Sequence, residues 1–395
     1  MSFTTDALTH AQRRRGLAAA IVCVSVAGAA FGLSTPLLAL LLERVETPST
    51  LIGLNTSVPA LAILAATPFF PAAIRRLGMI PFLQICLFVT MASFVALYFV
   101  GVDIWRWLPL RFIGGIAIAG LFVGSEIWIN QVVSEQNRGR TLGLYATGLA
   151  GGFAVGPLIL NATGVDGFAP FAVGAVIIVA AALPLIGAVA PGEHDAAETD
   201  KGQAGPTAFK AMVLAAPVTF FAAAAFGAVE NAILNLTPVY GVKLGLGEGP
   251  ATTMITVFGL GTMACQIFIG RLADQFRPIS VLAACAVIAV LGAGFLPIAA
   301  TQLALLYPLL FIWGGVVVGL YTVGLTRLGK TFKGPALAPA NAAFVFMYAL
   351  GSLIGAPVAG AAMDVLGPHG LPLALAVLMS VYLGLIASRW RANGL

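Results

Sequence analysis

Residues 250–298 read PATTMITVFGLGTMACQIFIGRLADQFRPISVLAACAVIAVLGAGFLPI, two apolar runs separated by the polar stretch RLADQFR. Each run has about 20 residues, which at 1.5 Å per residue is enough for a helix to cross roughly 30 Å of hydrocarbon. Alternation with a period of two residues is absent, which excludes a membrane β-barrel. The stretch therefore predicts two transmembrane helices joined by a short loop.

The same pattern recurs along the whole chain of 395 residues, of which 60% are apolar and 9% charged. The mean hydropathy of +1.01 is far above that of a water-soluble domain. We therefore predict an all-α integral membrane protein with twelve transmembrane helices. The expected spans are 17–41, 50–73, 80–101, 106–130, 141–161, 168–190, 211–240, 250–270, 278–298, 303–326, 337–362 and 370–388.

The 20 Lys and Arg residues are distributed unevenly between the two sides of this predicted topology. Sixteen fall in the N-terminal tail and the loops on its side, three (Arg44, Arg106 and Lys243) fall on the other side, and Arg111 lies inside a span. Because basic loops stay in the cytoplasm, we expect both termini to lie in the cytoplasm. We expect the protein itself to lie in the cytoplasmic (inner) membrane of a bacterium. This bias accounts for the net charge of +5, so we predict no nucleic-acid role.

Two halves of six spans are related by short matches. AAFG occurs at 29–32 and 224–227, Gly-Gly at 114–115 and 314–315, and the set Tyr145, Gly148, Gly152 matches Tyr348, Gly351, Gly355. Their offsets of 195, 200 and 203 indicate a direct repeat. We predict two pseudo-symmetric six-helix bundles, 1–190 and 211–395, joined by a polar cytoplasmic linker at 191–210, with a substrate site between them.

Several motifs resemble those of the major facilitator superfamily. Gly270, Leu272, Ala273 and Asp274 match its loop signature, and LRFIGGIAIAGLFVG at 110–124 resembles the Arg-containing motif of its fourth helix. GLAGGFAVGPLIL at 148–160 resembles part of the Gly-Pro motif of drug/proton antiporters, but Leu160 and Asn161 stand where that motif has Gly-Gly. SEIWINQVVSEQNRGRTLGLY, LTPVYGVKLGL and GSLIGAPVAGAAMDVLG together resemble the YcaD-like branch of bacterial permeases.

The resemblance implies cytoplasmic gates at the loop signatures. Arg271 and Asp274 form the better preserved copy, and Arg327 or Lys330 is the candidate partner of Asp274. In the first-half copy Arg75 stands where the family has Asp, and Glu135 is a candidate partner of opposite charge. Arg138 lies in the same loop as Glu135.

Intramembrane charged residues are the candidate sites for a proton or a substrate, because an ionised group in hydrocarbon is costly. Glu126 can bind a proton or a cationic group, or it can be a structural partner of Arg138. Glu230, beside Asn231, can carry a proton, or it can be exposed in an outer vestibule. Arg111 can line a cavity, or it can reach the interface near Trp105 and Trp107, which we expect to anchor the helix end. Asn55 is a further candidate for cavity lining, whereas Glu43 and Asp364 lie at span ends, at the expected outer surface.

These features predict a secondary active transporter that works by alternating access. Proton coupling must use carboxylates, because every His lies outside the spans. Export of an amphipathic or drug-like compound is favoured over uptake of a small polar solute, and a non-transporting sensor or assembly protein is the alternative from another class. Motifs for a cofactor, a metal or enzymatic catalysis are absent. The expected partners are a small-molecule substrate, protons and the lipid bilayer, and we expect a monomer.

Overall fold

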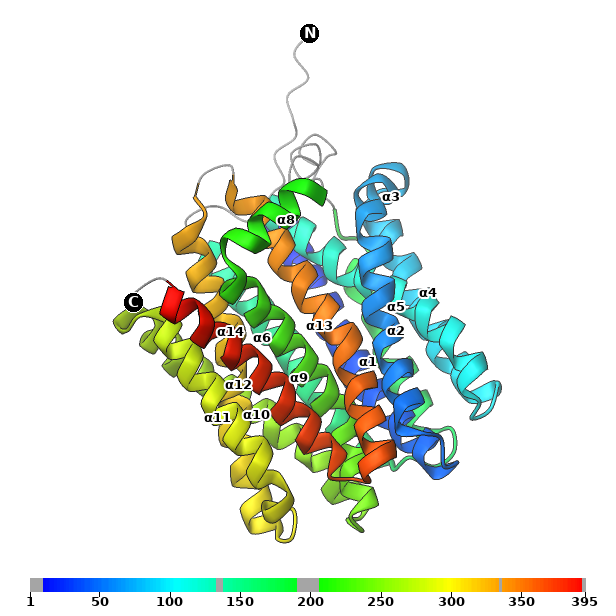
Figure 1. Cartoon of the computed structure of the whole chain (residues 1–395). Helices are drawn as coiled ribbons and strands as arrows, with labels where there is room; N and C mark the ends of the chain where they lie inside the picture. Colours follow the sequence, from blue (N-terminus) through cyan, green and yellow to red (C-terminus); the bar gives the residue numbers. More distant parts are fainter. Residues whose placement is uncertain (1–9, 133–137, 190–205, 334–335, 393–395) are drawn as a thin grey trace. The chain divides into compact units, whose positions relative to one another are not determined.

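A computed structural model describes residues 10–132, 138–189, 206–333 and 336–392. Within these ranges the chain is helical and contains no β-strand (Figure 1). A helix satisfies its own backbone hydrogen bonds, which is what an apolar chain requires when no water is available. The predicted all-α fold is therefore confirmed.

The first half contains seven α-helices and two short 3-10 helices in its described residues. They are α1 (His10–Arg44), α2 (Ser49–Ala66), η1 (Thr67–Phe69), α3 (Phe70–Leu77), α4 (Met79–Phe99), α5 (Ile104–Val132), α6 (Arg138–Thr163), α7 (Ala169–Ala180) and η3 (Leu183–Leu185).

The second half contains seven further α-helices in its described residues. They are α8 (Pro206–Ala215), α9 (Pro217–Lys243), α10 (Glu248–Gln275), α11 (Pro278–Ala299), α12 (Leu303–Thr331), α13 (Leu337–Leu366) and α14 (Gly370–Ala392).

Each of the twelve predicted spans falls on a helix or on consecutive helices. Nine helices among the described residues are long and apolar enough to cross a membrane, and Ala169–Leu185 is a shorter apolar helix. The second span is interrupted at η1, where a proline follows Thr67 and a second follows Phe70. The helix count is thus consistent with twelve crossings.

The RLADQFR stretch differs from its prediction as a loop. Helix α10 continues to Gln275, so residues 271–275 form its last turns, and the chain leaves the helix at Phe276. Ala273 is fully buried, so the packed face of α10 extends beyond the predicted span.

The chain divides into two compact units. Unit 1 comprises residues 1–37 and 61–201, and unit 2 comprises residues 38–60 and 202–395. Residues 38–60, the C-terminal end of α1 and most of α2, therefore group with the second half of the sequence. The predicted six-helix bundles remain a prediction, since the compact units assign this segment differently.

In unit 1, helices α1 and α6 pack backbone against backbone. A Cβ at Gly152 would overlap the carbonyl oxygen of Ser25, and a Cβ at Gly156 would overlap the backbone of Gly32 and Leu33. Glycine is therefore required at both positions for this close approach.

In unit 2, helices α9 and α13 repeat the same contact. A Cβ at Gly351 would overlap the carbonyl oxygen of Ala224, and one at Gly355 would overlap that of Ala228. Gly152 and Gly156 thus correspond to Gly351 and Gly355, an offset of 199 residues. The sequence matches had paired Gly148 and Gly152 with Gly351 and Gly355 at an offset of 203, and this register of the repeat remains a prediction, because glycines four residues apart match in either register.

Candidate functional site

Glu230 lies within α9 in unit 2, and the residue is half-buried. The hydroxyl group of Tyr348, on α13, donates a hydrogen bond of 2.7 Å to Glu230 Oε2. Helices α9 and α13 lie side by side, so an ionisable group of one helix is bonded directly to the other (Figure 1). This predicted candidate therefore has a specific partner, which the sequence did not reveal.

Aromatic rings surround this hydrogen bond. The ring of Tyr348 stacks on Phe226 of α9 at a centroid distance of 5.9 Å, and it meets Tyr321 of α12 edge-on at 5.8 Å. Tyr321 also contacts Phe226, at 5.5 Å. Three rings from three helices thus form an amphipathic wall beside one carboxylate, with tyrosine hydroxyls as its polar groups.

Asn231, which follows Glu230 in the sequence, and Asn235 are hydrogen-bonded to each other through their side chains. Asn231 Nδ2 donates to the carbonyl oxygen of Ser352 on α13, and Asn235 Nδ2 donates to Asn231 Oδ1 at 2.7 Å. The Ser352 hydroxyl donates back to the carbonyl oxygen of Gly227 at 3.2 Å. Asn231 therefore holds α9 against α13 one turn along α13 from Tyr348, through Ser352, which was not among the predicted site residues.

Asn55 lies on α2, in the part of that helix that belongs to unit 2. Its side chain is fully buried, and so is that of Ser57 two residues on. Ser57 Oγ donates to the carbonyl oxygen of Gly53 at 3.0 Å, within its own helix. Asn55 and Ser57 thus point to different sides of α2, and both sides are buried.

Arg111 lies on α5 in unit 1 and is 6% exposed. Its Nη1 donates to Ser34 Oγ of α1 at 3.4 Å. This burial contradicts the interpretation in which Arg111 reaches the membrane interface. A buried guanidinium bonded to a serine hydroxyl is instead a fixed positive charge inside unit 1.

Glu126 lies fifteen residues further along α5 and is exposed. The neighbouring Trp128 is fully buried, and its ring faces Gly16 of α1, where a Cβ would lie 3.0 Å from Nε1. One turn of α5 thus carries both a residue packed against α1 and the carboxylate of Glu126, which acts electrostatically on Tyr145 of α6. Glu126 and Glu230 belong to different compact units.

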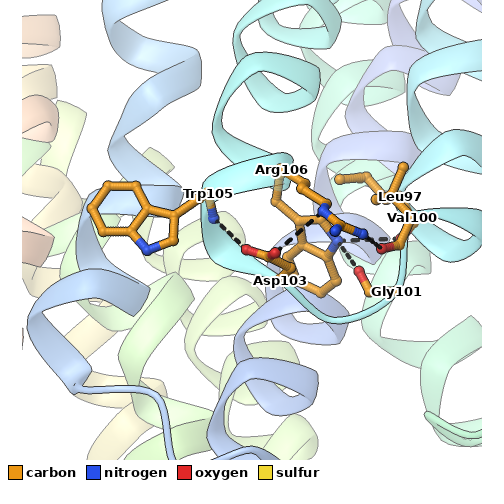
Figure 2. Close-up of polar contacts among 7 residues, drawn as sticks. Leu97, Val100, Gly101, Asp103, Trp105 and Arg106 are labelled. Carbon is orange, nitrogen blue, oxygen red and sulfur yellow. Dashed lines mark hydrogen bonds and ion pairs between the residues drawn. The ribbon is translucent and has the colours of Figure 1, made fainter.

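The N-terminal end of α5 carries a helix cap formed by Asp103 (Figure 2). Asp103 Oδ1 accepts a hydrogen bond of 2.9 Å from the backbone N–H of Trp105, and Asp103 Oδ2 lies 3.3 Å from Arg106 Nε. Trp107 is 1% exposed, and its Nε1 donates to the carbonyl oxygen of Gly101 at 2.8 Å. The prediction that Trp107 anchors the helix end at the membrane interface was wrong, because its buried ring packs α5 against the end of α4. Trp105 is 67% exposed, so its role as an anchor remains a prediction.

The predicted cytoplasmic gating residues lie at helix ends. Arg271 is exposed in the last turns of α10, and Lys330 Nζ of α12 donates to the carbonyl oxygen of Ala273 at 3.4 Å. The candidate partner Lys330 therefore reaches the turn that carries Asp274, and Arg327 lies one turn earlier on α12. The side chain of Asp274 lies outside the described part of the structure.

The first-half copy of this motif is only partly described. Arg75 is exposed in the last turn of α3, which ends at Gly78 with φ of 81°. Glycine tolerates this backbone conformation, which explains why the copy keeps Gly78. Glu135 and the side chain of Arg138 lie outside the described residues, so their pairing with Arg75 and Glu126 remains a prediction.

A further cluster of charged residues lies within unit 2, and four of its members (Glu43, Arg44, Lys243 and Asp364) were expected only as residues of the outer side. Arg44 Nη2 of α1 is 2.7 Å from Glu248 Oε1 of α10, and Lys243 Nζ of α9 is 3.4 Å from Glu43 Oε1 of α1. Asp364 of α13 accepts hydrogen bonds from the first residues of α2. The sequence feature that could have indicated these pairs is the presence of opposite charges at the ends of the first span (Glu43) and the seventh span (Lys243).

Metal ligands do not cluster in the described ranges, where no group of three His, Cys, Asp or Glu side chains could hold an ion. The four cysteines are free thiols; Cys23, Cys86 and Cys285 are buried and Cys265 is half-buried.

Comparison with known proteins identifies the family. The sequence model described as Major Facilitator Superfamily matches residues 20–327 and 244–393. The chain belongs to the major facilitator superfamily. The resemblance inferred from the loop signature and the fourth-helix motif is therefore confirmed, and the chain is a multi-pass membrane protein.

Two relatives and one solved structure agree with this assignment. The chain is 27% identical over 347 residues to the uncharacterized MFS-type transporter YfkF of Bacillus subtilis (strain 168), with 86% of each chain covered. It is 25% identical over 349 residues to the uncharacterized MFS-type transporter YcaD of Salmonella enteritidis, with 88% of each covered. A bacterial homologue of the human lysosomal transporter Spinster, in an inward-facing and occupied conformation, has a similar fold, with a TM-score of 0.78, 14% identity and 98% of each chain covered.

Proposed function

We propose that this protein is a secondary active transporter that moves a small molecule by alternating access, coupled to protons. Its membership in the superfamily and the transporter names of its relatives support the first part of the proposal. The fold that it shares with a solved transporter supports a mechanism in which two helical halves move against each other.

The observation that carries proton coupling is the hydrogen bond between Glu230 and Tyr348. An ionised carboxylate only accepts hydrogen bonds, whereas a protonated carboxyl also donates one. Proton binding at Glu230 therefore changes the bond that joins α9 to α13. Because glycines bring these two helices into backbone contact, a change at this bond acts directly on their packing.

The surroundings of Glu230 favour an amphipathic substrate. The rings of Phe226, Tyr321 and Tyr348 offer apolar and polarisable surface, with few amide groups beyond Asn231 and Asn235. The partial Gly-Pro motif in α6 favours export. Uptake of a small polar solute would require more hydrogen-bonding groups than this wall supplies.

The charge distribution supports the proposed orientation. Sixteen of the basic residues lie on the side of the termini, so we place both termini in the cytoplasm and the protein in the inner membrane of a bacterium. It acts as a monomer in this proposal, since one chain supplies all twelve crossings.

A substrate screen in proteoliposomes tests this proposal. Purified protein is reconstituted, and libraries of amphipathic cations, amphipathic anions and small polar solutes are assayed with and without a pH gradient. We expect the flux of at least one amphipathic class to depend on the gradient. Flux of polar solutes alone would support uptake, and no flux of any class would support a non-transporting protein.

A further inference from the structure

The first turn of α2 depends on a side chain from another helix. The carbonyl oxygen of Pro48 accepts the N–H groups of Leu51 and Ile52, at 2.9 and 3.1 Å. The N–H groups of Ser49 and Thr50 instead donate to Asp364 of α13, at 2.7 and 2.9 Å. The Thr50 hydroxyl adds a third bond to the same carboxylate, at 2.6 Å.

This arrangement differs from an ordinary helix cap, in which the capping residue directly precedes the helix. Asp364 is separated from α2 by more than 300 residues of sequence, yet its negative charge lies at the positive end of the α2 dipole. Pro48 occupies the usual capping position, and its side chain has no group that could accept a hydrogen bond, so Asp364 supplies the cap instead. Separation of α2 from α13 would therefore remove the cap.

Two ion pairs reinforce the contact at the end of α1. Arg44 donates to Glu248 through both Nε and Nη2, each at 2.7 Å, and the adjacent Glu43 lies 3.4 Å from Lys243. Neighbouring residues of α1 thus pair with opposite charges at the end of α9 and the start of α10. A slide of α1 along these helices would place like charges together, so the pattern fixes one docked position.

The surfaces beneath these polar contacts meet backbone to backbone. A Cβ at Gly53 of α2 would overlap the carbonyl oxygen of Ala356, and a Cβ at Gly360 of α13 would overlap that of Ser49. At these points the two helices meet through backbone atoms, a contact that small residues permit and that the polar groups at the helix ends reinforce.

We propose that Asp364, together with the pairs Arg44–Glu248 and Glu43–Lys243, is an outer latch. The latch holds residues 38–60 against α9, α10 and α13, and it must release before the transport site opens to the outer face. This inference rests on the proposed alternating-access function and on the proposed orientation, in which these residues face outward. On release, water replaces Asp364 at the exposed N–H groups of α2 and solvates the four separated charges.

The rate of thiol labelling at a buried position of α2 tests the latch. Ser57, which is fully buried in the docked segment, is replaced by Cys in the full-length protein in proteoliposomes. The reaction with a membrane-impermeant maleimide is followed, and the labelling of the parent protein with its four native cysteines is subtracted. We expect Asp364→Asn and Glu248→Arg each to accelerate labelling roughly five- to thirtyfold, as loss of a small stabilising contribution predicts.

Two controls separate the latch from general destabilisation. Asp103→Asn removes a carboxylate that caps its own helix, α5, and we expect the labelling rate of the parent. Adding Arg44→Glu to Glu248→Arg restores an ion pair with reversed polarity, and we expect labelling to slow toward the parent rate. If Asp364→Asn fails to give a folded, monodisperse protein, the charge-reversal pair decides the question.

The latch is overturned if folded Asp364→Asn and Glu248→Arg proteins are labelled at the parent rate, or if the reversed pair restores nothing. Labelling needs neither a substrate nor a proton gradient. A protein that shows no flux but whose labelling responds to these variants would retain the latch and lose the proposed function. Flux with unresponsive labelling would overturn the latch alone.

Discussion

Glu230 is a carboxyl group held within an apolar helix, and Tyr348 contacts it from the next helix at 2.7 Å. The phenol can donate to the carboxylate or accept from the carboxylic acid, so the pair remains hydrogen-bonded in both protonation states. Asn231 and Ser352 hold the same two helices together next to it. At the scale of single residues, this geometry is what a coupling site requires.

Removal of one hydroxyl group tests this pair. Tyr348→Phe keeps the ring contact with Phe226 but removes the bond to Glu230. Because hydrogen bonds to charged groups contribute about 1.5–3 kcal/mol, we expect proton-coupled flux to fall by about tenfold or more. The initial rate of substrate-dependent flux is measured across a range of pH.

Tyr98→Phe is the matched control, since Tyr98 packs its ring on Phe168 and Phe171 of unit 1. A Tyr348→Phe protein with the same rates and pH profile as wild type and Tyr98→Phe would show that the hydrogen bond has no part in coupling.

Single residues were predicted from the sequence where their chemistry is unusual for their surroundings. Glu230 and Arg111 stand out because charge is costly in a span. Asp364 does not stand out, because a carboxylate at the end of a span is ordinary, and its role depends on α2, far away in the sequence. Trp107 was misjudged because the same ring serves either at an interface or as a buried donor.

At the scale of helices, glycine determines which pairs can approach most closely. The contacts of Gly152 and Gly156 with α1 recur as those of Gly351 and Gly355 with α9. The sequence indicated that these helices were equivalent, but a chain rich in Ala and Gly left their register ambiguous by one turn. The end of α10 was likewise misplaced, because Arg271 and Asp274 interrupt the apolar run without ending the helix.

The packing of α9 on α13 predicts a difference between two otherwise similar substitutions. Gly351→Ala places a methyl group against the Ala224 carbonyl oxygen, whereas Gly384→Ala, on α14, has nothing within 4 Å of the new Cβ. We expect Gly351→Ala to lose about 1–3 kcal/mol of stability through overpacking. Thermal unfolding of the purified proteins in detergent measures the difference, and equal melting temperatures would contradict the α9–α13 contact.

At the scale of the whole molecule, the composition and the periodic apolar runs predicted the membrane fold, and the motifs predicted the family. The compact units could not be predicted in the same way. Residues 38–60 precede the linker by far, yet they group with residues 202–395 through contacts such as Asp364 with Thr50. Such contacts join segments that share neither sequence proximity nor a repeat position.

The proposed topology predicts where reporter domains can function. A fluorescent protein fused after residue 395 should fold and fluoresce in the cytoplasm, and alkaline phosphatase fused at the same point should be inactive. Alkaline phosphatase fused after Glu46, in the loop between α1 and α2, should be active outside. The opposite pattern would reverse the orientation and place the proposed outer latch at the cytoplasmic face.

The central claim is that Glu230 couples proton movement to substrate movement. The most direct measurement follows the internal pH of proteoliposomes after addition of a substrate found in the screen, while substrate exchange is measured in the same preparation. Wild type and Asp166→Asn, which changes an exposed carboxylate between α6 and α7, should both show substrate-dependent proton flux. Glu230→Gln should lose this proton flux and keep substrate exchange; proton flux equal to that of wild type in Glu230→Gln, or none in wild type, would contradict the account.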